Sequence, residues 1–254
     1  MDLHVIIEQM ETGDQDAALS ALQRFNREMS QCFMFNREED DDRKHLGELV
    51  IGLLTRELQP SCLLACLETI RILSRDKCCL DPFISCSAMS ILSRYAGIAT
   101  TCLSLLPQSA WMEGQVEDEE GAEKEPCSAL ENSDQEVIVE ALKSICNILL
   151  HNETGQVRAA ELQLIKGVAE RLKQCYDPTW GYEVHFFDLR LTFLLTALRL
   201  DVRAQLAQEL HGIRLLGNTM ELRFVWLVSN EHLSSLTKFP YKPCLLVFPG
   251  LATD

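Results

Sequence analysis

The sequence predicts an all-α protein whose helices stack as repeats into an α-solenoid. Of the 254 residues, 47% are hydrophobic but only 7% are aromatic, and glycine (12) and proline (8) are scarce. This composition favours helices over β-sandwiches or barrels. Apolar residues also recur at helical spacing from about residue 2 to residue 222. Finally, three of the expected helices resemble one another at a regular separation, as set out below.

Five helices are expected before residue 100. Their apolar stripes run through residues 3–10, 19–29, 46–58, 61–76 and 84–95. Local signals mark where several of them begin or end. Gly13 and Asp14 separate the first two, Pro60 suits the first turn of the fourth, Asp81-Pro82 starts the fifth, and Gly97 stops it.

The second half of the chain continues the helical pattern. We expect helices over residues 134–152, 156–174 and 184–200, with a loop at 178–181. The helix over 184–200 is apolar on nearly all sides and should be central and buried. Asp201 can cap a further helix over 202–216, in which Gly212 marks a bend or a break.

Two stretches depart from this pattern. Residues 108–133 lack apolar periodicity, and positions 113–136 hold ten acidic residues and one lysine. We interpret 108–133 as a disordered acidic loop within a helical domain of residues 1–222. Residues 223–254 contain three of the eight prolines and short β-prone runs. They are expected to form a poorly ordered tail.

The repeat signal comes from three leucine-rich helices, which begin their similarity at Leu67, Leu142 and Leu191. The first two starting points are 75 residues apart and the last two are 49 apart. Leaving out the acidic loop reduces the first separation to about 47, within the range of armadillo and HEAT repeats. Such repeats stack into a right-handed superhelix with a concave binding surface. A compact, non-repetitive helical bundle is the alternative.

Composition excludes several classes of function. The net charge of −15 and the pI of about 4.8 argue against general nucleic-acid binding, which needs a basic surface. No apolar run reaches the roughly 18 residues of a membrane span, and the N-terminus lacks the basic region of a signal peptide. We therefore expect a cytoplasmic chain without an integral membrane segment.

Neither the cysteines nor the histidines suggest catalysis. The eleven cysteines include no CxxC pair, so we interpret them as reduced and mostly buried rather than as zinc ligands. The six histidines show no metal-ligand spacing, and nucleophile-elbow, P-loop and HExxH motifs are missing. The sequence therefore indicates a binding protein without metal or cofactor rather than an enzyme.

Arg71 and Arg75 are the most distinctive candidate site residues. They lie four positions apart in an expected helix, so they should share a face and present two guanidinium groups to carboxylates. The competing interpretation is that they pair with internal acids such as Glu68, Asp76 or Asp81.

Two further polar positions stand inside apolar helices. Asn147 can bond the backbone of a neighbouring helix or face a groove and bind a partner's backbone. Asp188 and Arg190 need partners in so apolar a helix, and an internal ion pair is the simpler explanation.

Several separated blocks of the chain resemble the synembryn family. They include ETGDQDAALSALQRFNREMSQCFMF from Glu11, LETIRILSRDKCCLDPF from Leu67, ALKSICNILL from Ala141 and VHFFDLRLTFLLTALRLDVRAQLAQELHGIRLL from Val184. The resemblance covers about residues 1–222 and is closer to the A-type paralogue. Synembryns are chaperones and guanine-nucleotide exchange factors for heterotrimeric G-protein alpha subunits, and they fold as armadillo/HEAT-like solenoids.

The resemblance implies a mechanism without covalent chemistry. The concave face grips the C-terminal helix of the alpha subunit, GDP leaves, and the nucleotide-free subunit is held until GTP enters. Arg71, Arg75 and Asn147 match family positions that line this binding surface, and Arg190 is a weaker candidate. The chain would act as a monomer that its partner recruits to the cell cortex.

The resemblance also raises one doubt about activity. Family members continue for several more helical repeats, so this chain corresponds to a truncated solenoid in which exchange and chaperone activity are expected to suffer. A generic armadillo-like scaffold with another protein partner is the alternative function.

Overall fold

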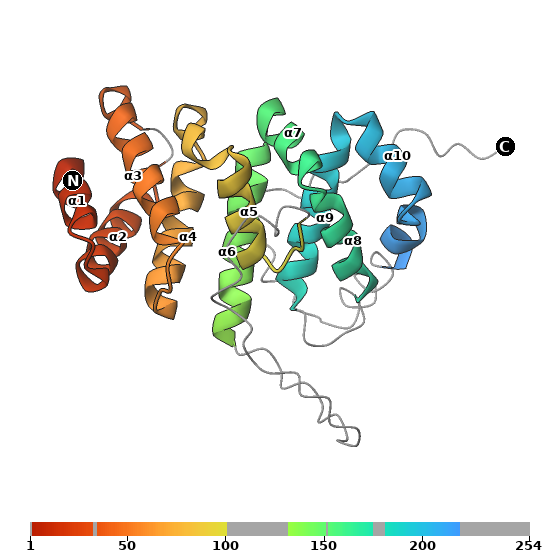
Figure 1. The fold of residues 1–254 in the computed structure, drawn as a ribbon, viewed down its shortest axis with the longest axis horizontal. Helices are drawn as coiled ribbons and strands as arrows, with labels where there is room; N and C mark the ends of the chain where they lie inside the picture. Colours follow the sequence, from red (N-terminus) through yellow and green to blue (C-terminus); the bar gives the residue numbers. More distant parts are fainter. Residues whose placement is uncertain (1, 33–34, 101–131, 151, 175–180, 219–254) are drawn as a thin grey trace, which may run out of the picture.

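The computed structural model describes residues 2–32, 35–100, 132–150, 152–174 and 181–218, and every regular element in these ranges is helical (Figure 1). The α-helices are α1 (Leu3–Glu11), α2 (Gln15–Met29), α3 (Asp40–Leu53), α4 (Pro60–Leu73), α5 (Cys86–Tyr95), α6 (Asn132–Leu149), α7 (Glu153–Glu161), α8 (Leu164–Lys173), α9 (Tyr182–Ala197) and α10 (Leu200–Gln208). Short 3₁₀ turns are η1 (Arg37–Glu39), η2 (Lys77–Cys79) and η3 (Asp81–Phe83). The predicted acidic loop and tail fall outside the described residues, apart from 132–133 at the start of α6.

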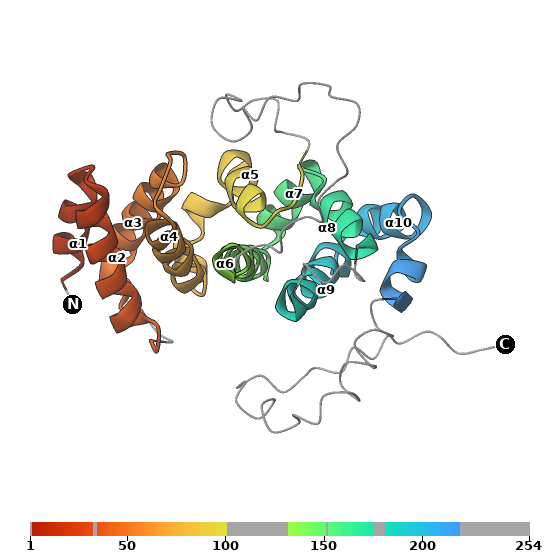
Figure 2. The same ribbon diagram turned by 90° about the horizontal axis from the view of Figure 1, so that it is seen from below.

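The helices form two layers along an elongated molecule. Helices α2, α4, α6 and α9 make up one layer, which we call the helix row, and each packs against the next. Figure 2 shows the row as a shallow arch along one side, with α3, α5, α7, α8 and α10 along the other. The three helices that resemble one another in sequence, α4, α6 and α9, are neighbours in this row. The predicted all-α solenoid is confirmed, whereas its assignment to armadillo or HEAT repeats stays a prediction.

Local signals explain several helix boundaries. The carboxylate of Asp14 accepts hydrogen bonds from the backbone N–H groups of Asp16 and Ala17, so it caps α2 as predicted. Pro60 occupies the first turn of α4. Gly97 follows α5 with a φ of +65°, a conformation that glycine adopts without strain.

Polar side chains join neighbouring helices of the row above a continuous apolar core. The side-chain Nδ2 of Asn26 on α2 donates to the Ala65 carbonyl of α4 at 2.9 Å, and its Oδ1 accepts from the Thr69 hydroxyl at 2.8 Å. Ser144 of α6 donates to the Leu67 carbonyl of α4 at 3.2 Å. We call each contact between neighbouring helices of the row a joint. Beneath these joints lie fully buried apolar side chains, including Leu22, Phe25, Leu67, Ile70, Leu73, Leu142 and Ile145.

The helix predicted over 156–174 is in fact two helices. α7 ends at Glu161 and α8 begins at Leu164, because Gln163 adopts a left-handed backbone with a φ of +58°. The Gln163 side chain supports this break: its amide donates to the Ala160 carbonyl, and its oxygen accepts from Gln205 at 2.7 Å. Neither glycine nor proline stands at or next to Gln163, so no local sequence signal predicted this helix break.

Other predicted boundaries shift by a few residues. Asp81-Pro82 opens η3 rather than the next α-helix, which starts at Cys86 after the Ser85 cap. α3 ends at Leu53, before Leu58. Asp201 lies inside the first turn of α10 and pairs with Arg199 at 2.6 Å instead of capping the helix. Gly212 coincides with a break, because α10 ends at Gln208 and a helical segment resumes at 212.

The prediction that the helix over 184–200 is central and buried is wrong in part. One face of α9 is buried through Val184, Asp188, Leu191 and Leu195. On the opposite face the Phe186 and Phe193 side chains keep 36% and 47% of their surface exposed. Helix α9 ends at Ala197, and Leu198 and Leu200 beyond it are exposed.

Gly167 of α8 permits a close approach between two elements. A Cβ at this position would lie 2.5 Å from Ile98 Cγ2 and 2.7 Å from the Ala99 carbonyl oxygen. We expect Gly167→Ala to lower the free energy of unfolding by about 1–3 kcal/mol through overpacking. Gly52→Ala is the matched control, because a Cβ there meets nothing within 4 Å, and it should stabilise by roughly 0.5–1 kcal/mol. Urea denaturation followed by circular dichroism measures both, and equal effects would contradict the assignment.

Within the described ranges, none of the helices has both the length and the apolarity needed to cross a lipid bilayer.

Candidate functional site

Arg71 lies at the C-terminal end of α4, in the middle of the helix row. Its Nε forms an ion pair with Glu140 of α6, and Lys143 reaches the same carboxylate at 2.7 Å. The Arg71 side chain is 23% exposed and that of Glu140 is 12% exposed. An internal acid therefore does pair with Arg71, but it is none of the three predicted from the sequence. A guanidinium has five N–H donors, so an ion pair through Nε leaves donors for a further carboxylate.

The three acids predicted as partners have other roles. Glu68 accepts a hydrogen bond from Asn26 at 3.2 Å, Asp76 accepts from the backbone N–H of Cys78, and Asp81 pairs with Lys44 at 3.2 Å. Sequence proximity suggested these acids, whereas the actual partner of Arg71 lies on the neighbouring helix.

Arg75 lies beyond the end of α4, because that helix stops at Leu73 and Asp76 caps the next turn. The expectation that Arg71 and Arg75 share one helix is therefore wrong. Arg75 Nη1 donates to the Ser30 carbonyl at the end of α2, at 3.0 Å, while Arg71 points to α6. Arg75 remains exposed. The two cations thus stand at the two joints on either side of α4.

Asn147 on α6 adopts the first of the two arrangements considered for it. Its Nδ2 donates to the backbone carbonyl of Arg71 at 3.1 Å, which ties α6 to the last turn of α4. Its side chain is half-buried. Within the described part of the chain no hydrogen bond uses its Oδ1.

Asp188 and Arg190 have separate environments on α9. Asp188 is fully buried and forms a bidentate ion pair with Arg171 of α8, which also donates to the Ala96 carbonyl. The expected internal ion pair thus exists for Asp188. Burial raises the pKa of Asp188 more than Arg171 lowers it. Arg190 is half-buried on the α9 side of the row, and it forms no ion pair with the other described residues.

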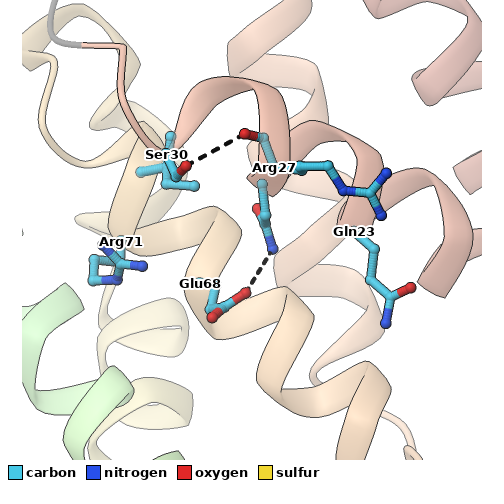
Figure 3. Close-up of a pocket in the computed structure, with 7 residues that line it drawn as sticks. Gln23, Arg27, Ser30, Glu68 and Arg71 are labelled. Carbon is cyan, nitrogen blue, oxygen red and sulfur yellow. Dashed lines mark hydrogen bonds between the residues drawn. The ribbon is translucent and has the colours of Figure 1, made fainter.

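An open cleft of about 390 Å³ lies between α2 and α4 and ends at Arg71 (Figure 3). Its other lining residues are Gln23, Asn26, Arg27, Ser30, Glu68 and Ile72, of which only Glu68 was named from the sequence. The lining is mainly polar, with cations at Arg27 and Arg71 and an anion at Glu68. The repeated spacing of polar residues on α2 at positions 23, 26, 27 and 30 was the signal that could have found it.

One group of potential metal ligands occurs among the described residues, formed by Asp40, Asp76 and Cys79. The guanidinium of Arg43 pairs with Asp40 at 2.5 Å and is only 1% exposed. It also bonds Cys79, although burial is the larger influence and raises the pKa of that thiol to about 11. Arg43 therefore already supplies the positive charge that these acids need, and the group does not suit a cation.

His185 of α9 makes the stability of this region dependent on pH. Both of its ring nitrogens are buried and have no hydrogen-bond partner among the described residues, and Asp188 and Arg171 are the charged groups that face it. Burial lowers the pKa of His185 below its usual 6.5. The unfolded chain therefore binds a proton more readily, so the free energy of unfolding should fall as the pH drops below about 6.5.

The test compares urea midpoints between about pH 7.5 and about pH 5.5 for the wild type and His185→Gln. The variant should lose less stability on acidification. Glu11 raises the pKa of His45, so protonation of His45 stabilises the fold at acidic pH. Because both chains contain His45, the difference between their losses of stability on acidification is due to His185. Identical pH dependence in both chains would show that His185 is not responsible.

Comparison with known proteins identifies the family of this chain. A family model described as guanine nucleotide exchange factor synembryn (Ric8) matches residues 66–232, which reaches past Leu222. Relatives named Chaperone Ric-8A are 56% identical over 224 residues in Danio rerio, 47% over 221 in Xenopus laevis and 46% over 222 in Gallus gallus. These alignments cover 87–88% of this chain and 36–37% of each relative. The chain thus spans little more than a third of those proteins.

A family match over most of the chain, identity above 40% with these relatives and the predicted helical architecture point to the same conclusion. This chain belongs to the synembryn (Ric8) family.

Proposed function

We propose that this chain binds the C-terminal helix of heterotrimeric G-protein alpha subunits along the helix row. The observation that carries the proposal is the placement of Arg71, Arg75, Asn147 and Arg190 on or beside successive helices of that row, in a chain whose net charge is −15. Cations on neighbouring helices of an acidic protein favour a partner that offers carboxylates.

Arg71 and Arg75 supply guanidinium donors for the carboxylates of the partner. The Oδ1 of Asn147 offers an acceptor for a partner backbone N–H at the same joint. Glu140 holds the Arg71 guanidinium in place before the partner arrives, which reduces the conformational entropy lost on binding. All of these contacts are non-covalent, so in this proposal the partner is recognised by binding alone, without any covalent step.

Binding of the C-terminal helix supports a chaperone and exchange role. If the chain binds a state of the alpha subunit in which this helix has moved away from the nucleotide pocket, it raises the population of that state and GDP leaves. The nucleotide-free subunit is held until GTP enters. We propose this role for a monomeric, cytoplasmic chain.

The experiment uses purified 1–254 with a GDP-loaded alpha subunit and with its isolated C-terminal peptide. Binding is measured by fluorescence anisotropy, and GDP release is followed in the same samples. Saturable binding of the peptide is expected, together with faster GDP release from the loaded alpha subunit. A well-folded chain that binds neither species would overturn the proposal and favour a scaffold with another partner.

A further inference from the structure

Ser30 follows the last residue of α2 and lines the cleft between α2 and α4. It is half-buried, and among the described residues its hydroxyl makes one hydrogen bond, of 3.3 Å, to the Arg27 carbonyl. Figure 3 shows Ser30 with Arg27 on one side and Arg71 on the other. None of the described residues between Met29 and Arg37 belongs to a helix. Because helix ends also fray, an enzyme can bind the chain around Ser30 without unfolding the helix row.

An arginine stands three residues before Ser30 in the sequence. A basic residue at this distance is the feature by which a large class of protein kinases selects a serine. In the whole chain an arginine or lysine precedes a serine or threonine at this distance in two places, Arg27 before Ser30 and Arg71 before Ser74. Ser74 is only 4% exposed. Ser30 alone therefore combines the recognition residue with an accessible hydroxyl.

Three arginines lie around Ser30. Arg75 Nη1 donates to the backbone carbonyl of Ser30 at 3.0 Å. Because this carbonyl and the hydroxyl belong to one residue, a phosphate on Oγ comes within reach of the Arg75 guanidinium. Arg27 lies one helical turn before Ser30, is exposed, and forms no ion pair with the other described residues. Arg71 lines the same cleft, in which Glu68 is the acid.

A phosphate on Ser30 gains more from these cations than it loses at the helix end. Its oxygens accept hydrogen bonds from a guanidinium more strongly than the neutral carbonyl that Arg75 now contacts. The opposing effect is the negative end of the α2 dipole, which disfavours an anion at the C-terminus of the helix. That effect is weaker than two charge-assisted hydrogen bonds. The phosphate is therefore expected to draw Arg27 and Arg75 toward it.

We propose that Ser30 is a phosphorylation site for a protein kinase that selects an arginine three residues before the acceptor, and that its phosphate forms ion pairs with Arg27 and Arg75. In this reaction the Ser30 hydroxyl oxygen attacks the γ-phosphorus of ATP. The bond from that phosphorus to the β–γ bridging oxygen breaks, ADP leaves, and the hydroxyl proton passes to a base of the kinase. The modified chain no longer offers Arg75 to the carboxylates of a partner. This last consequence rests on the proposed function, whereas the modification and the ion pairs do not.

The modification is tested with purified 1–254, ATP and the catalytic domain of a calmodulin-dependent protein kinase, which selects an arginine at this position. Mass spectrometry maps the modified residues, and circular dichroism establishes that the chains are folded. Phosphate is expected on Ser30, while the buried Ser74 serves as the internal control and stays unmodified. Arg27→Gln should abolish the modification. A wild-type chain without phosphate on Ser30 would overturn the assignment of this site.

The ion pairs are tested through the second pKa of the phosphate, which is about 6 for a phosphoserine without partners. A chain synthesised with phosphoserine at position 30 is titrated by phosphorus NMR. Guanidinium groups favour the dianion, so this pKa should lie below about 6 and should rise again when Arg75→Gln is introduced. An identical pKa of about 6 in both chains would overturn the proposed pairing.

The consequence for binding is tested with the alpha-subunit peptide. Phosphate on Ser30 should weaken peptide binding roughly tenfold or more. A chain with phosphate on Ser87 is the matched control, because Ser87 is exposed on α5 in the other layer. It carries the same added charge and should bind as the unmodified chain does. Equal affinity of the Ser30-phosphorylated and unmodified chains would overturn this consequence.

Failure of the inference and failure of the proposed function give different results. An unmodified chain that does not bind the peptide would overturn the proposed function. In that case the modification map and the phosphate pKa would still decide whether Ser30 is modified and paired, since neither measurement uses a partner.

Discussion

Reversing the charge of both Arg71 and Arg75 should abolish binding of the alpha-subunit peptide by this chain. Hydrogen bonds that involve a charged group contribute about 1.5–3 kcal/mol each. Losing one at each arginine therefore lowers affinity by at least roughly 100-fold, and the new carboxylates repel the peptide as well. Titration of Arg71→Glu/Arg75→Glu with the labelled peptide measures the loss.

This variant needs a check of its fold and two control variants. A glutamate at position 71 would face Glu140, so the fold must be checked by circular dichroism and thermal denaturation. Arg71→Gln/Arg75→Gln avoids the repulsion and should show an intermediate loss. Arg158→Glu/Arg199→Glu changes the net charge equally outside the helix row, beside α7 and α10, and should leave binding intact. If both charge-reversal variants lost the same affinity for the peptide, the loss would be due to net charge rather than to a local site at Arg71 and Arg75.

Removing Arg171 should produce the largest loss of stability. Asp188 is fully buried, Arg171 is 3% exposed, and their bidentate pair joins α9 to α8. Arg171→Met leaves the Asp188 carboxylate buried without its ion-pair partner. The free energy of unfolding should therefore fall by about 3–5 kcal/mol. It also leaves the Ala96 carbonyl at the end of α5 without this donor. Urea denaturation at neutral pH measures the change.

The double variant Arg171→Met/Asp188→Leu separates the pair from the packing around it. Replacing both partners removes the unpaired charge, so most of the lost stability should return. If Arg171→Met alone costs under about 1 kcal/mol, water reaches Asp188 and the pair does not hold α8 to α9.

The sequence predicted the helices well because their apolar residues repeat at a clear helical spacing and their ends carry familiar signals. Asp14, Pro60 and Gly97 act as expected. The break at Gln163 could not be predicted, because a contact with Gln205 from α10 supports it. The exposed face of α9 was missed for a related reason: composition shows that a helix is apolar all round but not how many neighbours it has.

The candidate site was predicted in outline but not in its contacts. Residue types and spacing identified Arg71, Arg75, Asn147 and Arg190, and resemblance supplied their roles. The ion pair of Arg71 with Glu140 joins residues that are 69 positions apart, which no local pattern reveals. Likewise, Asp188 pairs with Arg171 of α8 rather than with Arg190 on its own helix, because α8 packs against the buried face of α9 that carries Asp188.

The joints of the helix row share one design with a mechanical consequence. At each joint a side chain donates to a backbone carbonyl of the adjacent helix: Asn26 to Ala65, Asn147 to Arg71, and Cys146 to Phe187. Such a bond fixes the position of one helix along the axis of its neighbour. Between α4 and α6 two of these bonds act together, because Ser144 also donates to Leu67. Sliding one helix past the next would break every bond of this kind at once, so each joint keeps the register of the row.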